Sequence, residues 1–156
     1  MNTYLIDFEG YPQKNKFIIK ELSLYEITNK KYENFFIKTN QIKNCETYLW
    51  LLKKFHQIPY TYGETLFTDL KKKLNSPNII YFVKGENKLK ILKKIIKKNL
   101  VINLEEYGCP PYTWLSDPSI LLKCEYHNNC RHCALYKISK IANWLENENK
   151  NRGTLV

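Results

Sequence analysis

Hydrophobic positions in the first forty residues follow the two-residue period of β-strands. Apolar and β-forming residues fill segments 4–9, 17–27 and 32–38. Gly10 and Pro12 follow the first segment, and Asn29-Lys-Lys separates the other two, so turns are expected at both places. The pattern predicts three strands in an antiparallel meander, in which neighbouring strands pair.

The rest of the chain alternates between helical spacing and short apolar runs. Helices are expected over about 45–55, 63–74, 87–98 and 134–146, where apolar residues recur three and four positions apart. Segments 78–83 and 100–104 are continuous apolar runs, typical of buried parallel strands. The order β-β-β-α-α-β-α-β-α predicts an α/β fold, with a mixed sheet, helices on its faces and a C-terminal helix. Residues 1–146 would form one domain, and the polar segment 147–156 a flexible tail.

The composition indicates a globular protein and argues against a disordered or membrane-spanning one. A chain of 156 residues with 44% hydrophobic residues is long enough for one core and is not intrinsically disordered. No apolar run approaches the ~20 residues of a membrane span, and the first residues lack the layout of a signal peptide. We therefore expect an intracellular protein, nuclear or cytoplasmic, with no membrane partner. The net charge of +10 points instead to a polyanion, most often nucleic acid.

Two acidic residues share one face of the first predicted strand. Because side chains alternate along a strand, Asp7 and Glu9 project to the same side. Two such carboxylates can share divalent cations, Mg²⁺ or Mn²⁺, as two-metal phosphoryl-transfer sites require. The alternative is an exposed strand end with two solvated acids.

Cysteine and histidine gather near the C-terminus. Cys124, His127 and Cys133 supply three nitrogen or sulfur ligands of the kind that Zn²⁺ prefers. An odd total of five cysteines argues against a closed disulfide framework. Either Cys130 or His132 can serve as a local fourth ligand, although the spacing is cramped. The alternative is a group of thiols without metal.

Lysines concentrate on one face of the helix predicted over 87–98. Lys90, Lys93, Lys94 and Lys97 are three or four residues apart, and Lys84 precedes them. Such a face can contact phosphates without reading bases, and its binding is salt-sensitive. The alternative is an ordinary solvated helix face.

The segment Ile-Asp-Phe-Glu-Gly at the start of a three-stranded meander resembles the first motif of the DEDD exonucleases, whose fold is ribonuclease H-like. The resemblance implies two further acids. The second-motif position falls near Lys88 or Lys90, with Glu86 as a weak substitute.

The third motif of that family, of the type His-x-Ala-x-x-Asp, has a counterpart at the C-terminus. His132-Cys-Ala-Leu-Tyr matches it, but Lys137 stands where the Asp belongs. An ammonium group in place of a carboxylate opposes the binding of divalent cations. The resemblance therefore implies a degenerate nuclease with Asp7 and Glu9 as remnants, able to hold at most one weakly bound metal.

The sequence Cys-x2-His-x5-Cys-Ala-Leu leading into the last helix is similar to the Maelstrom domain, a ribonuclease H-like relative of the DEDD exonucleases. That family carries a Glu-Cys-His-Cys zinc site. The resemblance implies Glu21, Cys124, His127 and Cys133 as ligands of a structural Zn²⁺ that ties the last helix to the second strand. The chain departs from the family in retaining Asp7 and Glu9 and in its short His-to-Cys spacing.

Three functions follow from these patterns. The preferred interpretation is a domain that binds single-stranded RNA or DNA, with little or no catalysis and a structural zinc. The first alternative is an active metal-dependent nuclease that uses Asp7 and Glu9 with a third acid such as Glu86 or Asp69. The second is a scaffold for protein partners.

Overall fold

A six-stranded mixed sheet forms the centre of the computed structural model, which describes residues 1–40, 46–119, 122–127 and 131–153. The strand order is β4-β3-β2-β1-β5-β6. β1 to β3 form the antiparallel meander, and β5 and β6 continue the sheet parallel to β1. The strands are β1 (Asn2–Gln13), β2 (Lys16–Glu26), β3 (Lys31–Lys38), β4 (Thr65–Leu66), β5 (Ile79–Val83) and β6 (Leu100–Asn103).

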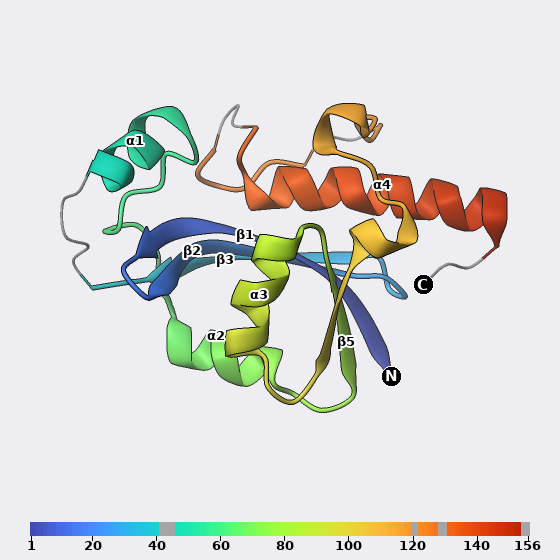
Figure 1. Ribbon diagram of the computed structural model, residues 1–156, viewed down its shortest axis with the longest axis horizontal. Coiled ribbons are helices and arrows are strands. Elements are labelled where there is room, and N and C mark those ends of the chain that lie inside the picture. The colour runs from blue at the N-terminus through green and yellow to red at the C-terminus, as the bar shows by residue number, and fades with distance from the viewer. Residues whose placement is uncertain (41–45, 120–121, 128–130, 154–156) are drawn as a thin grey trace.

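Helices cover both faces of this sheet. α4 lies across one face, and α2 and α3 lie on the other (Figure 1). The α/β class, the mixed sheet and the C-terminal helix are thus confirmed. The described helices are α1 (Glu46–Lys54), α2 (Phe67–Leu74), α3 (Glu86–Ile95) and α4 (Ala134–Arg152), with short 3₁₀ helices η1 (Leu104–Tyr107) and η2 (Tyr112–Trp114).

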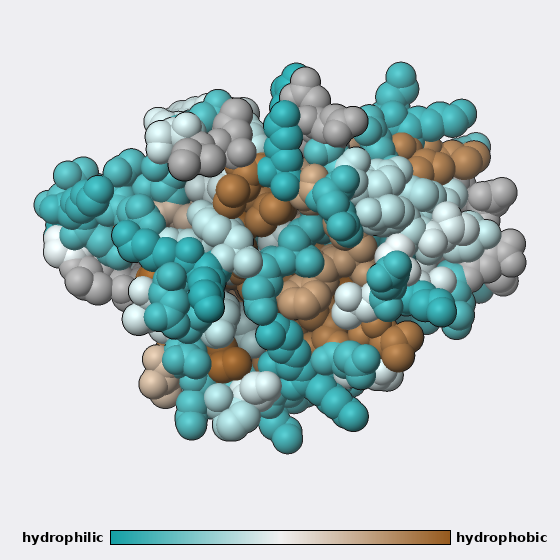
Figure 2. Space-filling model, turned by 180° about the vertical axis from the view of Figure 1, so that it is seen from behind, coloured by the Kyte–Doolittle hydropathy of each residue, from teal (hydrophilic) through white to brown (hydrophobic). Residues whose placement is uncertain are grey.

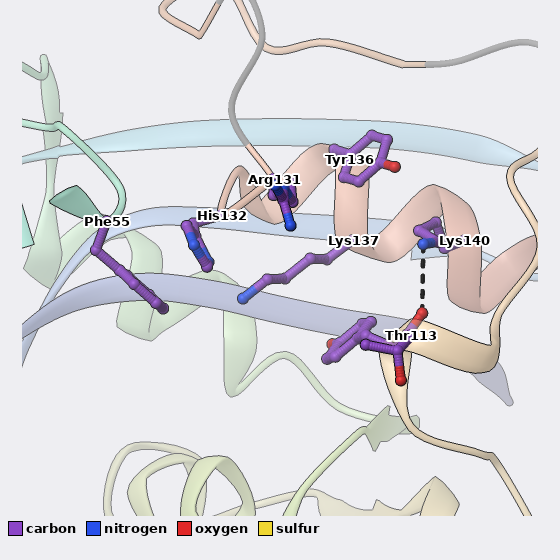
Figure 3. Close-up of a pocket in the computed structure, with 8 residues that line it drawn as sticks. Phe55, Thr113, Arg131, His132, Tyr136, Lys137 and Lys140 are labelled. Atoms are coloured by element: carbon purple, nitrogen blue, oxygen red, sulfur yellow. Dashed lines mark hydrogen bonds between the residues drawn. The ribbon is translucent and has the colours of Figure 1, made fainter.

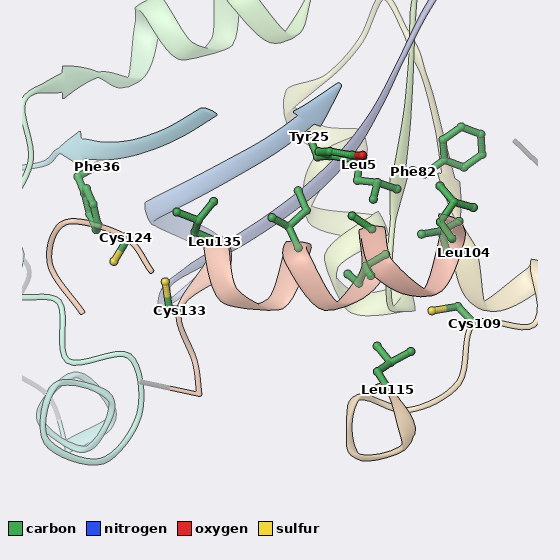
Figure 4. Close-up of a cluster of buried hydrophobic side chains, with 14 of the residues drawn as sticks. Leu5, Tyr25, Phe36, Phe82, Leu104, Cys109, Leu115, Cys124, Cys133 and Leu135 are labelled. Atoms are coloured by element: carbon green, nitrogen blue, oxygen red, sulfur yellow. The ribbon is translucent and has the colours of Figure 1, made fainter. Parts of the chain in front are cut away.

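The alternation along β1 divides the core into two layers. Leu5 belongs to the hydrophobic cluster beneath α4 (Figure 4), whereas Ile6 and Phe8 pack in the cluster with α2 and α3. By the same alternation Asp7 and Glu9 lie on the α4 side of the sheet. Both are buried, with 0% and 5% of their surface exposed, so they are not solvated acids at a strand end.

The turn expected after Glu9 is wrong. β1 continues to Gln13, and the register shifts between Glu9 and Gly10, which marks a β-bulge. A Cβ atom at Gly10 would lie 2.0 Å from the carbonyl oxygen of Ile18. Glycine therefore serves here for close approach of two backbones rather than for chain reversal.

Three helix boundaries also differ from the pattern. The helix expected to reach residue 98 ends at Ile95. The helix expected from residue 63 begins at Phe67, because Thr65–Leu66 pair with β3 as a short edge strand. The tail expected from residue 147 is helical as far as Arg152, whose side chain pairs with Glu148 one turn earlier at 3.0 Å. Residues 154–156 and the expected helix start at Cys45 lie outside the described residues.

The face of the molecule opposite to the view of Figure 1 is mostly hydrophilic. Seen from behind, polar side chains cover most of the molecule and hydrophobic patches between them are small (Figure 2). No helix within the described ranges combines the length and apolar character needed to cross a bilayer.

Candidate functional site

Four buried side chains meet where α4 begins. Glu21 comes from β2, Cys124 and His127 from the loop before α4, and Cys133 from the residue that precedes the helix. One potential ligand atom of each lies within 4.8 Å of all the others. Figure 4 shows the sulfur atoms of Cys124 and Cys133 directed toward one another at this end of α4.

Hydrogen bonds fix the orientation of these groups. The Ala134 amide donates to Oε1 of Glu21 at 2.7 Å, and the Cys133 thiol donates to Oε2 at 3.4 Å. The amide of His127 donates to the Cys124 sulfur at 3.1 Å. The amide at the start of α4 thus orients the carboxylate of Glu21, as outer partners of metal ligands commonly do.

A hydrogen bond to a backbone carbonyl determines which ring nitrogen of His127 faces the cluster. Nε2 of His127 donates to the carbonyl oxygen of His56, and Nδ1 lies 3.0 Å from the Cys124 sulfur. With its proton on Nε2, the ring directs the Nδ1 lone pair into the cluster. His56 is itself held by a hydrogen bond between its Nε2 and the carbonyl of Gly10 at 3.0 Å. These partners supply the outer support typical of metal-bound histidines.

The donor set fits Zn²⁺. Burial raises the pKa of Glu21 to about 8, and a hydrogen bond with Cys124 together with burial raises that of Cys133 to about 12. A divalent cation would compensate the negative charges that these environments disfavour. Two sulfurs, one imidazole and one carboxylate would fill a tetrahedral zinc site and leave no position for water, as in structural sites. The four residues inferred from the Maelstrom resemblance are thus brought together, in a group compatible with zinc.

Of the two alternative fourth zinc ligands, His132 and Cys130, the structure describes only His132. The His132 ring stacks on Phe55, with ring centres 3.6 Å apart, and His132 is not a member of the cluster. Cys130 lies outside the described residues.

The two acids of β1 meet two lysines. Lys88 Nζ lies 2.5 Å from Oδ1 of Asp7 and 3.7 Å from Oε1 of Glu9. Lys137 Nζ lies 2.5 Å from the same Glu9 oxygen. Lys88 and Lys137 are the residues that the DEDD resemblance aligned with two of that family's carboxylates, with Lys88 rather than Lys90 reaching Asp7.

The end of β5 explains how Lys88 reaches Asp7. β5 pairs with β1 only as far as Ile6, opposite Val83. Beyond that point the chain turns into α3, whose first turn carries Lys88. Lys137 approaches from the other side, on the first turn of α4. Two helix starts therefore deliver the ammonium groups.

Burial and these ion pairs set the protonation of the site. Burial raises the pKa of Asp7 and outweighs the attraction of Lys88 and Lys137. Burial also disfavours charge on Glu9, but Lys88 and Lys137 outweigh it and lower its pKa. For Lys88 the two carboxylates outweigh burial and raise its pKa. The site is a compensated network of charges, in which Oδ2 of Asp7 has no hydrogen-bond partner among the described residues.

The metal cluster and the acidic site are neighbours. Glu9 and Glu21 are directly opposite one another on β1 and β2. Cys133 precedes α4, and Lys137 follows one helical turn later. A metal that fixes the start of α4 would therefore also fix Lys137 over Glu9.

Three of the four lysines predicted to share a helix face are on α3, and Lys97 lies just beyond it, because the helix ends at Ile95. Lys90, Lys93, Lys94 and Lys97 are exposed, and none forms an ion pair with a carboxylate in the described parts of the chain. Lys84 lies apart from them: its side chain is buried and pairs with Glu105 at 3.6 Å. Of the five lysines proposed for nucleic-acid contact, Lys90, Lys93 and Lys94 therefore share α3, whereas Lys84 and Lys97 do not.

Sequence reasoning assigned no role to Lys20, which is fully buried in β2. Its ammonium group donates to the carbonyl oxygens of Ile37, Tyr60 and Tyr62 at 2.5, 3.0 and 2.6 Å. It thereby ties the segment before β4 to the sheet. The burial of Lys20 could have been expected from the sequence, because residues two positions apart on a strand share a face and Leu22 is buried.

Comparison with known proteins adds no assignment. No protein-family model matches this sequence, and no curated protein is significantly similar to it.

Proposed function

We propose that this chain is a ribonuclease H-like domain that binds single-stranded nucleic acid without cleaving it and uses a structural zinc. The observation that carries the binding function is the exposed group of Lys90, Lys93 and Lys94 on α3, with Lys97 just beyond its end, without described counter-charges. Lys71 and Lys72 on the neighbouring α2 are also exposed and extend this charge on the same side of the sheet, whereas Lys73 pairs with Glu33 at 3.4 Å. Cations spaced along a surface suit the phosphates of a strand.

The arrangement of strands supports the finer fold assignment. β1 pairs with β2 of the antiparallel meander on one side and with the parallel strand β5 on the other, which is the layout that the DEDD resemblance implies. The Glu-Cys-His-Cys cluster occupies the place that the Maelstrom resemblance implies for zinc. The zinc would fold and position α4, and it would take no part in chemistry.

The charge balance of the acidic site argues against catalysis. Two-metal catalysis requires carboxylates free to hold two cations about 4 Å apart. Here Asp7 and Glu9 are instead neutralised by Lys88 and Lys137. Neither third acid considered for an active nuclease, Glu86 or Asp69, forms an ion pair with this group of four.

Binding is tested by fluorescence anisotropy with labelled single-stranded RNA, single-stranded DNA and duplexes over a range of salt concentrations. We expect affinity for single strands to fall steeply with salt, with a slope of about 0.7 per phosphate contact. The Lys90→Glu/Lys94→Glu variant should bind much more weakly. Lys14→Glu/Lys150→Glu is the matched control, since it makes the same change in net charge at exposed positions elsewhere.

Three outcomes would overturn the proposal. Equal loss of binding in both double variants would show a response to net charge rather than to the α3 surface. Mg²⁺- or Mn²⁺-dependent cleavage that disappears in Asp7→Ala/Glu9→Ala would establish the active nuclease instead. If neither binding nor cleavage is detected, the scaffold function replaces both.

A further inference from the structure

A cavity of about 420 Å³ opens beside the acidic site, between η2, the start of α4 and the residue after α1. Its volume is in the range of small-molecule sites, about 300–1,000 Å³. Tyr112 and Thr113 come from η2, Phe55 follows α1, and Lys137 and Lys140 belong to α4. Elements far apart in sequence thus converge on one pocket (Figure 3).

The lining is cationic. Arg131, Lys137 and Lys140 contribute to it, and no Asp or Glu is among its lining residues in the described chain. Lys140 donates to the carbonyl oxygen of Tyr112 at 3.3 Å and lies 3.6 Å from Asp117. Lys137 is bound to Glu9 through one of its three protons. An ammonium group keeps donors for a further acceptor after one such bond.

Counting the neighbouring charges gives a small positive balance. Asp7, Glu9 and Asp117 carry three negative charges when ionised. Against them stand four cations: Lys88, Lys137 and Lys140, which pair with these acids, and Arg131, which lines the pocket. The pocket therefore favours an anion of low charge.

Aromatic rings form the remaining walls. Phe55 and His132 are stacked with an angle of 21° between their planes. Lys137 Nζ lies 5.6 Å from the Phe55 ring centre and 5.4 Å from that of Tyr112. Flat rings next to cations are the combination that accepts a base together with its phosphate.

We propose that this pocket binds one nucleoside monophosphate unit, with its phosphate on Lys137, Lys140 and Arg131 and its base against the Phe55–His132 stack. The inference rests on the proposed function, and it names one subsite that is distinct from the α3 lysine face. Lysine ammonium groups supply the positive charge beside Asp7 and Glu9, so binding requires no Mg²⁺.

The test is isothermal titration calorimetry of the zinc-loaded protein, without chelator, with nucleoside 5′-monophosphates, the corresponding nucleosides and inorganic phosphate. We expect the monophosphate to bind at least about tenfold more tightly than the nucleoside, as a charge-assisted hydrogen bond allows, and to be unaffected by added Mg²⁺. Lys140→Met and Arg131→Gln should each weaken binding about tenfold. The exposed Lys150→Met on the same helix is the matched control and should change nothing.

The nucleoside monophosphate unit can be the end of a nucleic-acid strand or a free nucleotide. Oligonucleotides with and without a terminal phosphate distinguish the two. A preference for the phosphorylated end that disappears in Lys140→Met identifies the end of a strand. Binding of the monophosphate alone identifies a free nucleotide. If the monophosphate does not bind, or binds equally well to Lys140→Met and Arg131→Gln, the pocket proposal is wrong. Salt-sensitive strand binding through Lys90 and Lys94 can still hold in that case, so the two proposals fail separately.

Discussion

Removing the Lys88 ammonium group should leave Asp7 buried without its closest counter-charge. In Lys88→Met the stem is nearly conserved, while the 2.5 Å ion pair is lost. Breaking a buried pair from one side costs about 3–5 kcal/mol. This loss of stability has an upper limit, because the buried Asp7 can become protonated instead of staying charged. Protonating an aspartate with an unfolded pKa of about 3.9 costs about 1.4 kcal/mol for each pH unit above that value. The limit is about 4 kcal/mol at pH 7 and about 2 kcal/mol at pH 5.5.

The sign of the pH dependence follows from linkage. Burial raises the pKa of Asp7 even in the presence of Lys88, and loss of the lysine raises it further. Between the unfolded and folded pKa values the native state binds more protons, so stability falls as pH rises. We therefore expect Lys88→Met to lose about 3 kcal/mol at pH 7 and less at pH 5.5.

Urea unfolding at both pH values, with zinc present throughout, measures these differences. The exposed Lys90→Met on the same helix is the control and should stay within about 0.5 kcal/mol of the wild type. Asp7→Asn/Lys88→Met should recover much of the loss, since neither charge remains. A Lys88→Met protein as stable as Lys90→Met, or a loss that does not shrink at pH 5.5, would refute the reasoning.

Three further perturbations test other parts of the structure. Cys133→Ser should abolish stoichiometric zinc by atomic absorption and lower the melting temperature, whereas Cys109→Ser, which alters a buried thiol outside the cluster, should retain the metal. Gly10→Ala should destabilise by more than about 3 kcal/mol in urea unfolding, because the new Cβ collides with the carbonyl of the neighbouring strand. Lys88→Asp/Lys137→Asp replaces two cations with two carboxylates and should create Mn²⁺ binding detectable by calorimetry, and absence of such binding would contradict the derivation from a two-metal site.

Local pattern predicted much of this protein. Period-two alternation placed Asp7 and Glu9 on one face of a strand, and helical spacing located the helices within a few residues. These features depend on neighbours along the chain, which the sequence displays directly. The errors fell where a distant backbone decides the outcome, as at Gly10, where β1 continues only because Ile18 approaches so closely.

The two sites required the tertiary structure. The bond between Ala134 and Glu21 spans 113 residues, and that between Lys137 and Glu9 spans 128. A resemblance suggested Glu21, but only the packing of α4 on β1 and β2 brings it to Cys133 and turns His132 toward Phe55. The sequence alone determined which charges and ligands the protein has. The packing of the helices on the sheet decided which of them meet, because burial forces each charged group to find a partner within a few ångströms.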